Sequence, residues 1–153
     1  MFYAYGMSIT LRYANSRDEA AEILNDAFMK VFDNITSFNP DRSFKPWLRT
    51  IIVNTAINHF HKTHNGWKRE ELEVVKNKMG VEETVISGIS YQEIVDLVQE
   101  LSPAYRMVFN LYVIEGFKHK AIAAMLGISV GTSKSNLAKA KKNLQVMLER
   151  NLI

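Results

Sequence analysis

The chain of 153 residues contains no cysteine, only three prolines, and no long hydrophobic run. Without cysteine it can form neither disulfide bonds nor a thiolate metal site. No apolar segment approaches the roughly 20 residues that a membrane-spanning helix needs. The N-terminus also lacks the basic and apolar regions of a secretory signal. Because 47% of the residues are hydrophobic, we expect packed domains in a cytoplasmic protein without membrane insertion.

Acidic residues are scarce in two parts of the chain. Residues 42–69 carry six basic side chains and no acidic one, and residues 118–153 carry seven basic side chains and one acidic, Glu149. Residues 1–41 and 70–117 are instead acidic overall, so the net charge is only +3. Two separate cationic blocks predict two contacts with a polyanion. An ordinary solvated surface is the alternative interpretation.

Apolar residues recur at helical spacing, which predicts an all-α fold of two small helical domains joined by a linker. We place the N-terminal domain at residues 1–62, the linker at 63–89 and the C-terminal domain at 90–153. Between the two domains the periodicity fades and glycines interrupt it. A helix-turn-helix is expected in the C-terminal domain.

Serine residues mark the expected starts of several helices. Ser16 with Glu19, and Ser90 with Glu93, have the spacing of a capping box, in which each side chain satisfies the other's backbone N–H. Ser102, which precedes a proline, is expected to cap the helix that follows it. The inner face of the helix after Ser16 is predicted to comprise Ala20, Ile23, Leu24, Ala27, Phe28, Val31, Phe32 and Ile35.

The acid-free stretch from Lys118 to Val146 has the pattern of a helix-turn-helix. A short helix with one apolar face runs into Gly127-Ile128-Ser129, and a longer, lysine-rich helix follows. Ser129 is expected to cap this second helix. Its inner stripe is predicted to be Val130, Ser133, Leu137, Ala140, Leu144 and Met147.

The remaining faces of the lysine-rich helix are expected to contact duplex DNA. Short polar side chains at the start of a recognition helix can reach base edges, and lysines further along contact phosphates. Binding should weaken steeply with salt because each phosphate contact releases counterions. A helical hairpin with a solvated basic face is the alternative. The predicted contacts are Thr132, Lys134, Ser135, Asn136, Lys139 and Lys142.

The helix expected from Phe44 to Lys62 has a polar, uncharged stripe surrounded by basic residues. Amide side chains can hydrogen-bond the edges of unpaired bases, and aromatic rings offer stacking surfaces, so the pattern favours single-stranded or melted DNA. The alternative is that its aromatic residues, including Trp47, belong to the core. The predicted contacts are Phe38, Arg42, Lys45, Arg49, Asn54, Asn58, His61 and Lys62.

Three stretches, in order, carry a family resemblance. They are residues 18–32 (DEAAEILNDAFMKVF), residues 44–60 (FKPWLRTIIVNTAINHF) and residues 101–142. The chain resembles the extracytoplasmic-function (ECF) sigma factors, the compact class of bacterial RNA polymerase specificity subunits, and most of all those of Bacteroidetes. In that family the first stretch binds the clamp of core polymerase. The second melts and reads the minus-ten promoter element, and the third reads the minus-thirty-five element.

The resemblance implies a protein that is not an enzyme and needs no cofactor or metal. It would bind core RNA polymerase, recognise promoter DNA as duplex and as melted non-template strand, and promote strand opening for transcription initiation. An anti-sigma protein is a further candidate partner. Core polymerase would dock on Glu22, Asn25, Asp26 and Lys30.

The chain departs from the family pattern at several positions. A further helix usually precedes the position of Met1, so the first helix of the N-terminal domain is expected to be missing. Residues 118–121 stand where a serine cap and acidic residues are usual. Ser133 replaces an aliphatic residue, and Asn136 replaces an arginine that is expected to hold a phosphate.

Two other functions remain open from the sequence. A stand-alone helix-turn-helix regulator would explain the C-terminal block, and it would bind a DNA operator without polymerase. A metal-dependent hydrolase is suggested by His59, His61 and His64, with His119 as a fourth ligand. That second alternative is weak, because positions 59 and 61 point to different helix faces and no carboxylate lies nearby.

Overall fold

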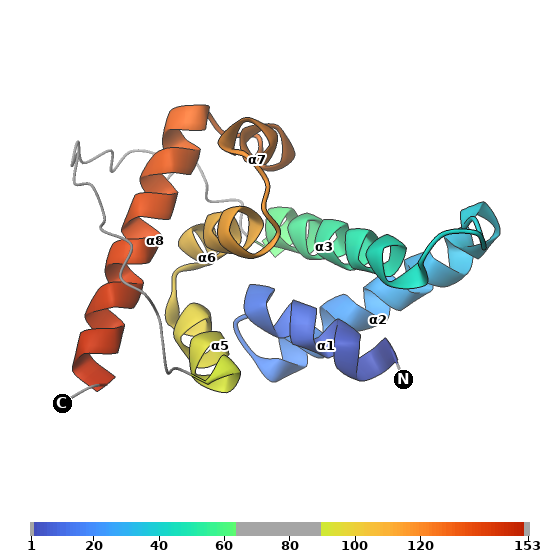
Figure 1. Ribbon diagram of the computed structural model, residues 1–153, viewed down its shortest axis with the longest axis horizontal. Coiled ribbons are helices and arrows are strands. Elements are labelled where there is room, and N and C mark those ends of the chain that lie inside the picture. The colour runs from blue at the N-terminus through green and yellow to red at the C-terminus, as the bar shows by residue number, and fades with distance from the viewer. Residues whose placement is uncertain (1, 64–89, 152–153) are drawn as a thin grey trace. The chain divides into compact units, whose positions relative to one another are not determined.

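The computed structural model describes residues 2–63 and 90–151, and the regular structure in these ranges is entirely helical (Figure 1). The prediction of an all-α fold with two helical domains is therefore confirmed. The chain divides into two units, Met1–Thr63 and His64–Ile153. The predicted linker lies outside the described residues, apart from Thr63, which ends a helix. None of the described helices is long and apolar enough to cross a membrane.

In the first unit, α1 (Phe2–Tyr13), α2 (Arg17–Asn34) and α3 (Phe44–Thr63) each pack against the other two. A 3-10 turn, η1 (Ile35–Ser37), ends α2. Gly6 lets α1 approach α2 closely, since a Cβ at this position would clash with the buried side chain of Leu24. The large, fully buried side chains of this core are Ile9, Ile23, Leu24, Leu48 and Ile52.

At the start of α2, side chains accept hydrogen bonds from backbone N–H groups in a modified form of the predicted capping box. The Glu19 N–H donates to Ser16 Oγ at 3.1 Å, as expected. Glu19 Oε2, however, accepts from the backbone N–H of Asn15 at 3.1 Å, one residue before the N-cap. The carboxylate of Glu19 thus still accepts a hydrogen bond at the start of the helix, but from the residue before the N-cap rather than from the N-cap itself.

The inner face predicted for α2 is too wide. Phe32 and Ile35 are exposed, at 71% and 46%, whereas Val31 is buried. Neighbouring residues on a helix are about 100° apart, and near the end of α2 it is Val31 rather than Phe32 that faces the core. Ile35 already belongs to η1, where the helical period ends.

The second unit contains α5 (Tyr91–Glu100), α6 (Pro103–Phe109), the π-helical turn η2 (Asn110–Ile114), α7 (His119–Leu126) and α8 (Val130–Asn151). The long helix α8 packs against the other three α-helices. The core here includes Val98, Val108, Leu111, Ile122 and Leu137.

The helix ends of the second unit mostly follow the sequence signals. Ser90 and Glu93 form a complete capping box, and its two hydrogen bonds hold the pKa of the Glu93 carboxyl below its ordinary value. Gly127 ends α7 in the left-handed conformation, with φ 67°. Ser129 Oγ then accepts from the N–H of Thr132 at 3.0 Å, so the predicted cap of the helix-turn-helix is confirmed.

The C-terminal end of α5 is closed by a buried guanidinium. Arg106 is 2% exposed. Its Nε donates to the carbonyl of Val98 at 3.1 Å, and one terminal nitrogen donates to those of Gln99 and Leu101 at 2.7 and 2.8 Å. Carbonyls in the last turn of a helix lack the N–H of the next turn as a partner, although Val98 O also accepts from the N–H of Leu101 at 3.2 Å. The cap predicted for the side chain of Ser102 is wrong, because only its backbone carbonyl accepts a hydrogen bond, from Arg106 N.

Replacing Arg106 with methionine should destabilise the second unit, because buried carbonyls would lose a charged donor. We expect the free energy of unfolding to fall by about 3 kcal/mol, measured by urea denaturation with circular dichroism. The control is Arg150→Met, at the exposed end of α8, which should change stability little. Equal unfolding midpoints for the two variants would contradict the assigned role of Arg106.

Candidate nucleic-acid interface

The polar stripe predicted on α3 lies at the surface of the first unit. Thr50, Asn54, Asn58 and His61 are all exposed, while the opposite side of the helix is buried. The segregation follows from helical spacing, because the four residues recur at intervals of three and four. The amide groups of Asn54 and Asn58 are therefore available to a ligand along one side of α3.

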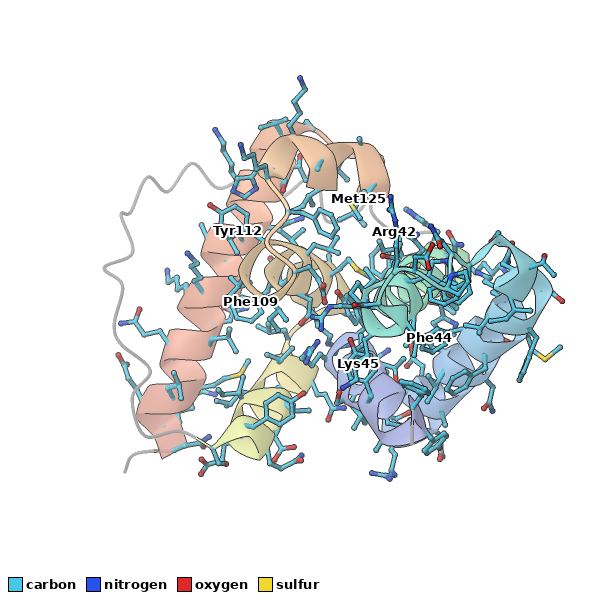
Figure 2. All side chains as sticks on the ribbon, turned by 45° about the vertical axis from the view of Figure 1, so that its right-hand side comes forward. Arg42, Phe44, Lys45, Phe109, Tyr112 and Met125 are labelled. Atoms are coloured by element: carbon cyan, nitrogen blue, oxygen red, sulfur yellow. The ribbon has the colours of Figure 1, made fainter. Side chains whose placement is uncertain are left out.

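The predicted basic rim of α3 is partly exposed. Arg42, Lys45 and Lys62 are exposed, and Arg49 is half-buried. Lys45 extends over α1, where its Nζ lies 5.3 Å from the centroid of the Tyr5 ring (Figure 2). The rim thus places positive charge around the stripe, although Lys45 is also held by a cation–π contact.

An open pocket of about 530 Å³ lies between the loop after α2 and the first turns of α3. Its walls combine aromatic rings with hydroxyl, amide and guanidinium groups, a mixture suited to a flat, polar-edged molecule. The backbone N–H of Asp41 donates to Asn39 Oδ1 at 2.9 Å, which shapes the loop. The lining residues are Ser37, Phe38, Asn39, Arg42, Ser43, Pro46, Trp47 and Thr50.

Four aromatic rings support this pocket. The ring centroid of Phe44 lies 4.8 Å from that of Phe2, 5.4 Å from that of Phe38 and 5.6 Å from that of Trp47. Phe38 and Trp47 are 5.0 Å apart. Such clusters stabilise one arrangement of rings, so the wall formed by Phe38 and Trp47 is held in place by Phe44.

Trp47, which the alternative interpretation placed in the core, lies partly at the surface. It is only half-buried, and it lines the pocket together with Thr50. Helical spacing could have revealed this, because Trp47 precedes Thr50 by three residues and so lies beside the polar stripe.

The residues predicted to dock core polymerase lie along the outer side of α2. Glu22, Asn25 and Asp26 are exposed, and Lys30 is half-buried. Two apolar side chains that the sequence argument did not include share this helix surface. Met29 is 62% exposed and Phe32 is 71% exposed. Contiguous apolar patches can mark interaction sites, so these two side chains become candidates for the docking surface.

The predicted DNA contacts on α8 differ in how far their side chains are exposed. Lys134 and Lys142 are exposed, and Thr132, Ser135 and Lys139 are half-buried. All five keep part of their surface accessible. They therefore remain candidates for contact with duplex DNA.

Asn136 is not available to DNA in this structure, and that prediction is wrong. Its exposed fraction is 4%. The reason is its spacing: Asn136 follows Ser133 by three residues and precedes Ala140 by four, and both of these are fully buried. Val130, predicted on the inner stripe, is instead 40% exposed at the first position of the helix.

The two arms of the helix-turn-helix are joined by a polar contact. Ser133 Oγ of α8 lies 2.8 Å from Nδ1 of His119, the first residue of α7. The His119 ring also stacks on Tyr112, with ring centroids 4.5 Å apart. A fully buried hydroxyl needs a partner, so His119 compensates for the serine in this core. Burial, followed by repulsion from Lys134 and Lys141, lowers the pKa of His119.

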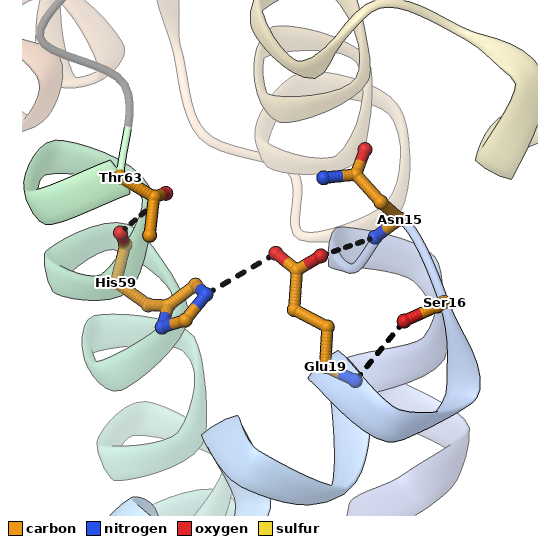
Figure 3. A network of polar contacts seen from close by, with 5 residues as sticks. All are labelled: Asn15, Ser16, Glu19, His59 and Thr63. Carbon is orange, nitrogen blue, oxygen red and sulfur yellow. Dashed lines mark hydrogen bonds and ion pairs between the residues drawn. The ribbon is translucent and has the colours of Figure 1, made fainter.

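The histidines do not assemble a metal site in the part of the chain that is described. No group of three or more His, Asp or Glu side chains that could hold a metal ion occurs there. His59 contacts Glu19 (Figure 3), and His119 contacts Ser133. His64 lies outside the described residues.

Two models of the sigma-70 family match the chain. The one described as Sigma-70 region 2 matches residues 6–65, and the one described as Sigma-70, region 4 matches residues 87–144. The first match contains α2, the pocket and α3. The second contains the helix-turn-helix.

Curated relatives are similar over most of the chain. The ECF RNA polymerase sigma-E factor of Escherichia coli K12 is 28% identical over 152 residues, covering 88% of this chain and 76% of the relative. The RNA polymerase sigma-H factor of Pseudomonas aeruginosa is 23% identical over 154 residues, covering 94% and 80%.

Solved structures share the fold. The sigma factor RpoE of Bartonella quintana, solved with the anti-sigma factor NepR, has a TM-score of 0.55 and 24% identity, covering 94% of this chain and 88% of its own. CnrH, solved with the cytosolic domain of CnrY, has a TM-score of 0.50 and 19% identity, covering 97% and 83%.

Protonation of His119 should destabilise the second unit. Because its pKa in the folded chain is below the ordinary value of 6.5, the unfolded chain binds protons more readily. The stability that the neutral ring contributes is present above that value and is lost as the pH falls below it. We expect the urea midpoint to fall between about pH 7 and pH 5 more for the wild type than for His119→Gln. His61→Gln, which changes an exposed histidine, should retain the wild-type dependence, and equal dependence in all three would contradict the assignment.

Proposed function

The chain belongs to the extracytoplasmic-function group of the sigma-70 family, and we propose that its first unit holds core polymerase and the opened promoter strand while its second unit reads duplex DNA. As a sigma factor, the protein binds core RNA polymerase and promoter DNA for transcription initiation and catalyses no reaction itself. The main support for assigning one role to each unit is that sigma-70 regions 2 and 4 both match this chain, one in each unit. We also propose that it acts in the cytoplasm, where bacterial polymerase meets DNA.

Strand capture is assigned to α3 and the pocket at its start. Unpairing a base costs a few kcal/mol, and stacking a base on an aromatic side chain returns about 1–3 kcal/mol. Phe38 and Trp47 offer such a surface, with Arg42 beside them for a phosphate. Asn54 and Asn58, further along α3, would hydrogen-bond the next unpaired bases. The pocket and the stripe together would thus offset part of the cost of opening.

Docking on core polymerase is assigned to the outer side of α2. Glu22, Asn25, Asp26 and Lys30 supply polar contacts there. Phe32 adds the kind of large apolar side chain that dominates the binding energy of many interfaces. Because Phe32 already faces solvent, it can be buried by a partner without rearrangement of the core.

Duplex recognition is assigned to α8. Thr132 and Ser135 lie in its first two turns and would approach base edges, while Lys134, Lys139 and Lys142 would contact phosphates. Lys139 Nζ lies 5.9 Å from the centroid of the Tyr105 ring, so its position is restricted before DNA binds. Asn136 is left out of this set.

An anti-sigma protein is a further proposed partner. RpoE of Bartonella quintana and CnrH were each solved in complexes of this kind. For this chain, a regulator that covered the outer side of α2 would compete with core polymerase for Phe32 and Glu22.

A stand-alone helix-turn-helix regulator is the alternative function. Two experiments on one promoter library distinguish the two functions. One is a gel shift with and without core polymerase, and the other is selective run-off transcription under the same two conditions. A sigma factor should retain promoter DNA and give promoter-specific transcripts only when core polymerase is present. Tight binding to an operator by the chain alone, without transcripts, would favour the regulator.

Substituting both Asn54 and Asn58 with alanine should impair strand opening more than duplex binding, because the exposed amides contact only separated bases. We expect permanganate reactivity of the opened region to fall about tenfold or more, with closed-complex binding changed little. Lys142→Ala is the matched control, since it should weaken duplex binding first. Equal loss of both signals in the Asn54/Asn58 variant, or loss of neither, would count against the assigned role.

Substituting Phe32 with serine should weaken binding of core polymerase without unfolding the protein. A side chain that is 71% exposed contributes little to the core, but its burial at an interface is worth about 1–3 kcal/mol. We therefore expect the dissociation constant to rise about 5- to 150-fold, measured by fluorescence anisotropy with labelled chain. Tyr3→Ser removes another exposed aromatic ring, 53% exposed on α1, and should bind core polymerase as the wild type does. Unchanged affinity of Phe32→Ser would remove this residue from the docking surface.

A further inference from the structure

A single carboxylate links the start of α2 to the end of α3 (Figure 3). Glu19 Oε1 lies 3.2 Å from Nε2 of His59, which is forty residues further along the chain. The two side chains are 20% and 14% exposed, so water screens the contact only in part. Glu19 belongs to the helix assigned to polymerase docking, and His59 belongs to the helix assigned to strand capture.

The carboxylate of Glu19 is fixed before it reaches His59. Its backbone N–H is held by Ser16 Oγ. Its second oxygen, Oε2, is held by the backbone N–H of Asn15. Because one oxygen is already anchored, the direction of the other is set by the turn between α1 and α2 rather than by a freely rotating side chain.

His59 stands where α3 would otherwise be least restrained. It lies four residues before Thr63, the last residue of the helix, and helix ends fray. Thr63 Oγ1 also donates to the carbonyl of His59 at 2.9 Å, which closes the last turn. This turn carries His61 and Lys62, and Asn58 immediately precedes His59. A change in the rotation or winding of this segment would move all three proposed strand contacts.

We propose that Glu19 and His59 are a positioning pair that fixes the strand-capturing end of α3 relative to the polymerase-docking helix α2. The inference rests on the proposed function. Neither residue needs to contact DNA or polymerase. The pair keeps Asn58, His61 and Lys62 in a fixed orientation relative to Glu22 and Asn25, so that polymerase held by α2 presents the end of α3 to the separating strand.

The test compares core binding with strand opening in the full chain. His59→Leu puts an apolar side chain of similar size in place of the donor, Glu19→Ala removes the acceptor, and the double variant removes both. His59→Gln can still donate to Glu19. Core affinity is measured by fluorescence anisotropy, and opening by permanganate reactivity of a promoter fragment bound to the holoenzyme.

We expect His59→Leu and Glu19→Ala to bind core polymerase within about twofold of the wild type and to lower opening about tenfold. The double variant should open as well as Glu19→Ala, because that substitution already breaks the contact with His59 as well as the one with the N–H of Asn15. His59→Gln should recover most of the opening. Asp18→Ala, which removes the other carboxylate in the first turn of α2, should open as the wild type does.

Three results would overturn the proposal. Core affinity and opening could fall in parallel, which would make the pair a contributor to stability alone. Core affinity and opening could both remain unchanged in His59→Leu. Alternatively, the losses of opening in the two single variants could multiply in the double variant. The proposed function fails separately, if the wild-type chain neither binds core polymerase nor opens the promoter. A wild type that opens normally beside an equally active His59→Leu would overturn only the positioning pair.

Discussion

Both units depend on side chains that satisfy the backbone groups at helix ends. Small domains bury little apolar surface, so the N–H and carbonyl groups that lack partners at helix ends have a large effect on their stability. Glu19 and Ser16 close the start of α2, Ser90 and Glu93 close that of α5, and Arg106 closes the end of α5. The same groups also orient the functional surfaces, because each closed end fixes where the next helix begins.

Local signals made much of the fold predictable. The N-caps at Ser16, Ser90 and Ser129 are set by a few neighbouring residues, and so they could be found from the sequence. The all-α class and the helix-turn-helix follow from helical periodicity. The site residues on α2, α3 and α8 stay predictions in their roles, as does the likeness to Bacteroidetes members.

Two of the errors, those at Phe32 and Asn136, share one physical cause. Periodicity gives the direction of a buried stripe but not its width, which depends on how close the neighbouring helices come. Phe32 was therefore placed inside and Asn136 outside, although the structure exposes the first and buries the second. The contact between His119 and Ser133 joins two helices, and it could not be predicted from the local sequence around either residue. Trp47 was placed in the core by the alternative interpretation because it is apolar, although its spacing from Thr50 puts it beside the polar stripe.

The exposed side chains of Met29 and Phe32 have a consequence for the protein when it is not docked. A surface that gains free energy by being covered is also attractive to other copies of the same chain and to unrelated apolar surfaces. Unbound copies are therefore expected to self-associate more readily as they accumulate beyond the number of polymerases available. On the docking role proposed for α2, the side chains that favour assembly would thus also limit how far the unbound protein can accumulate.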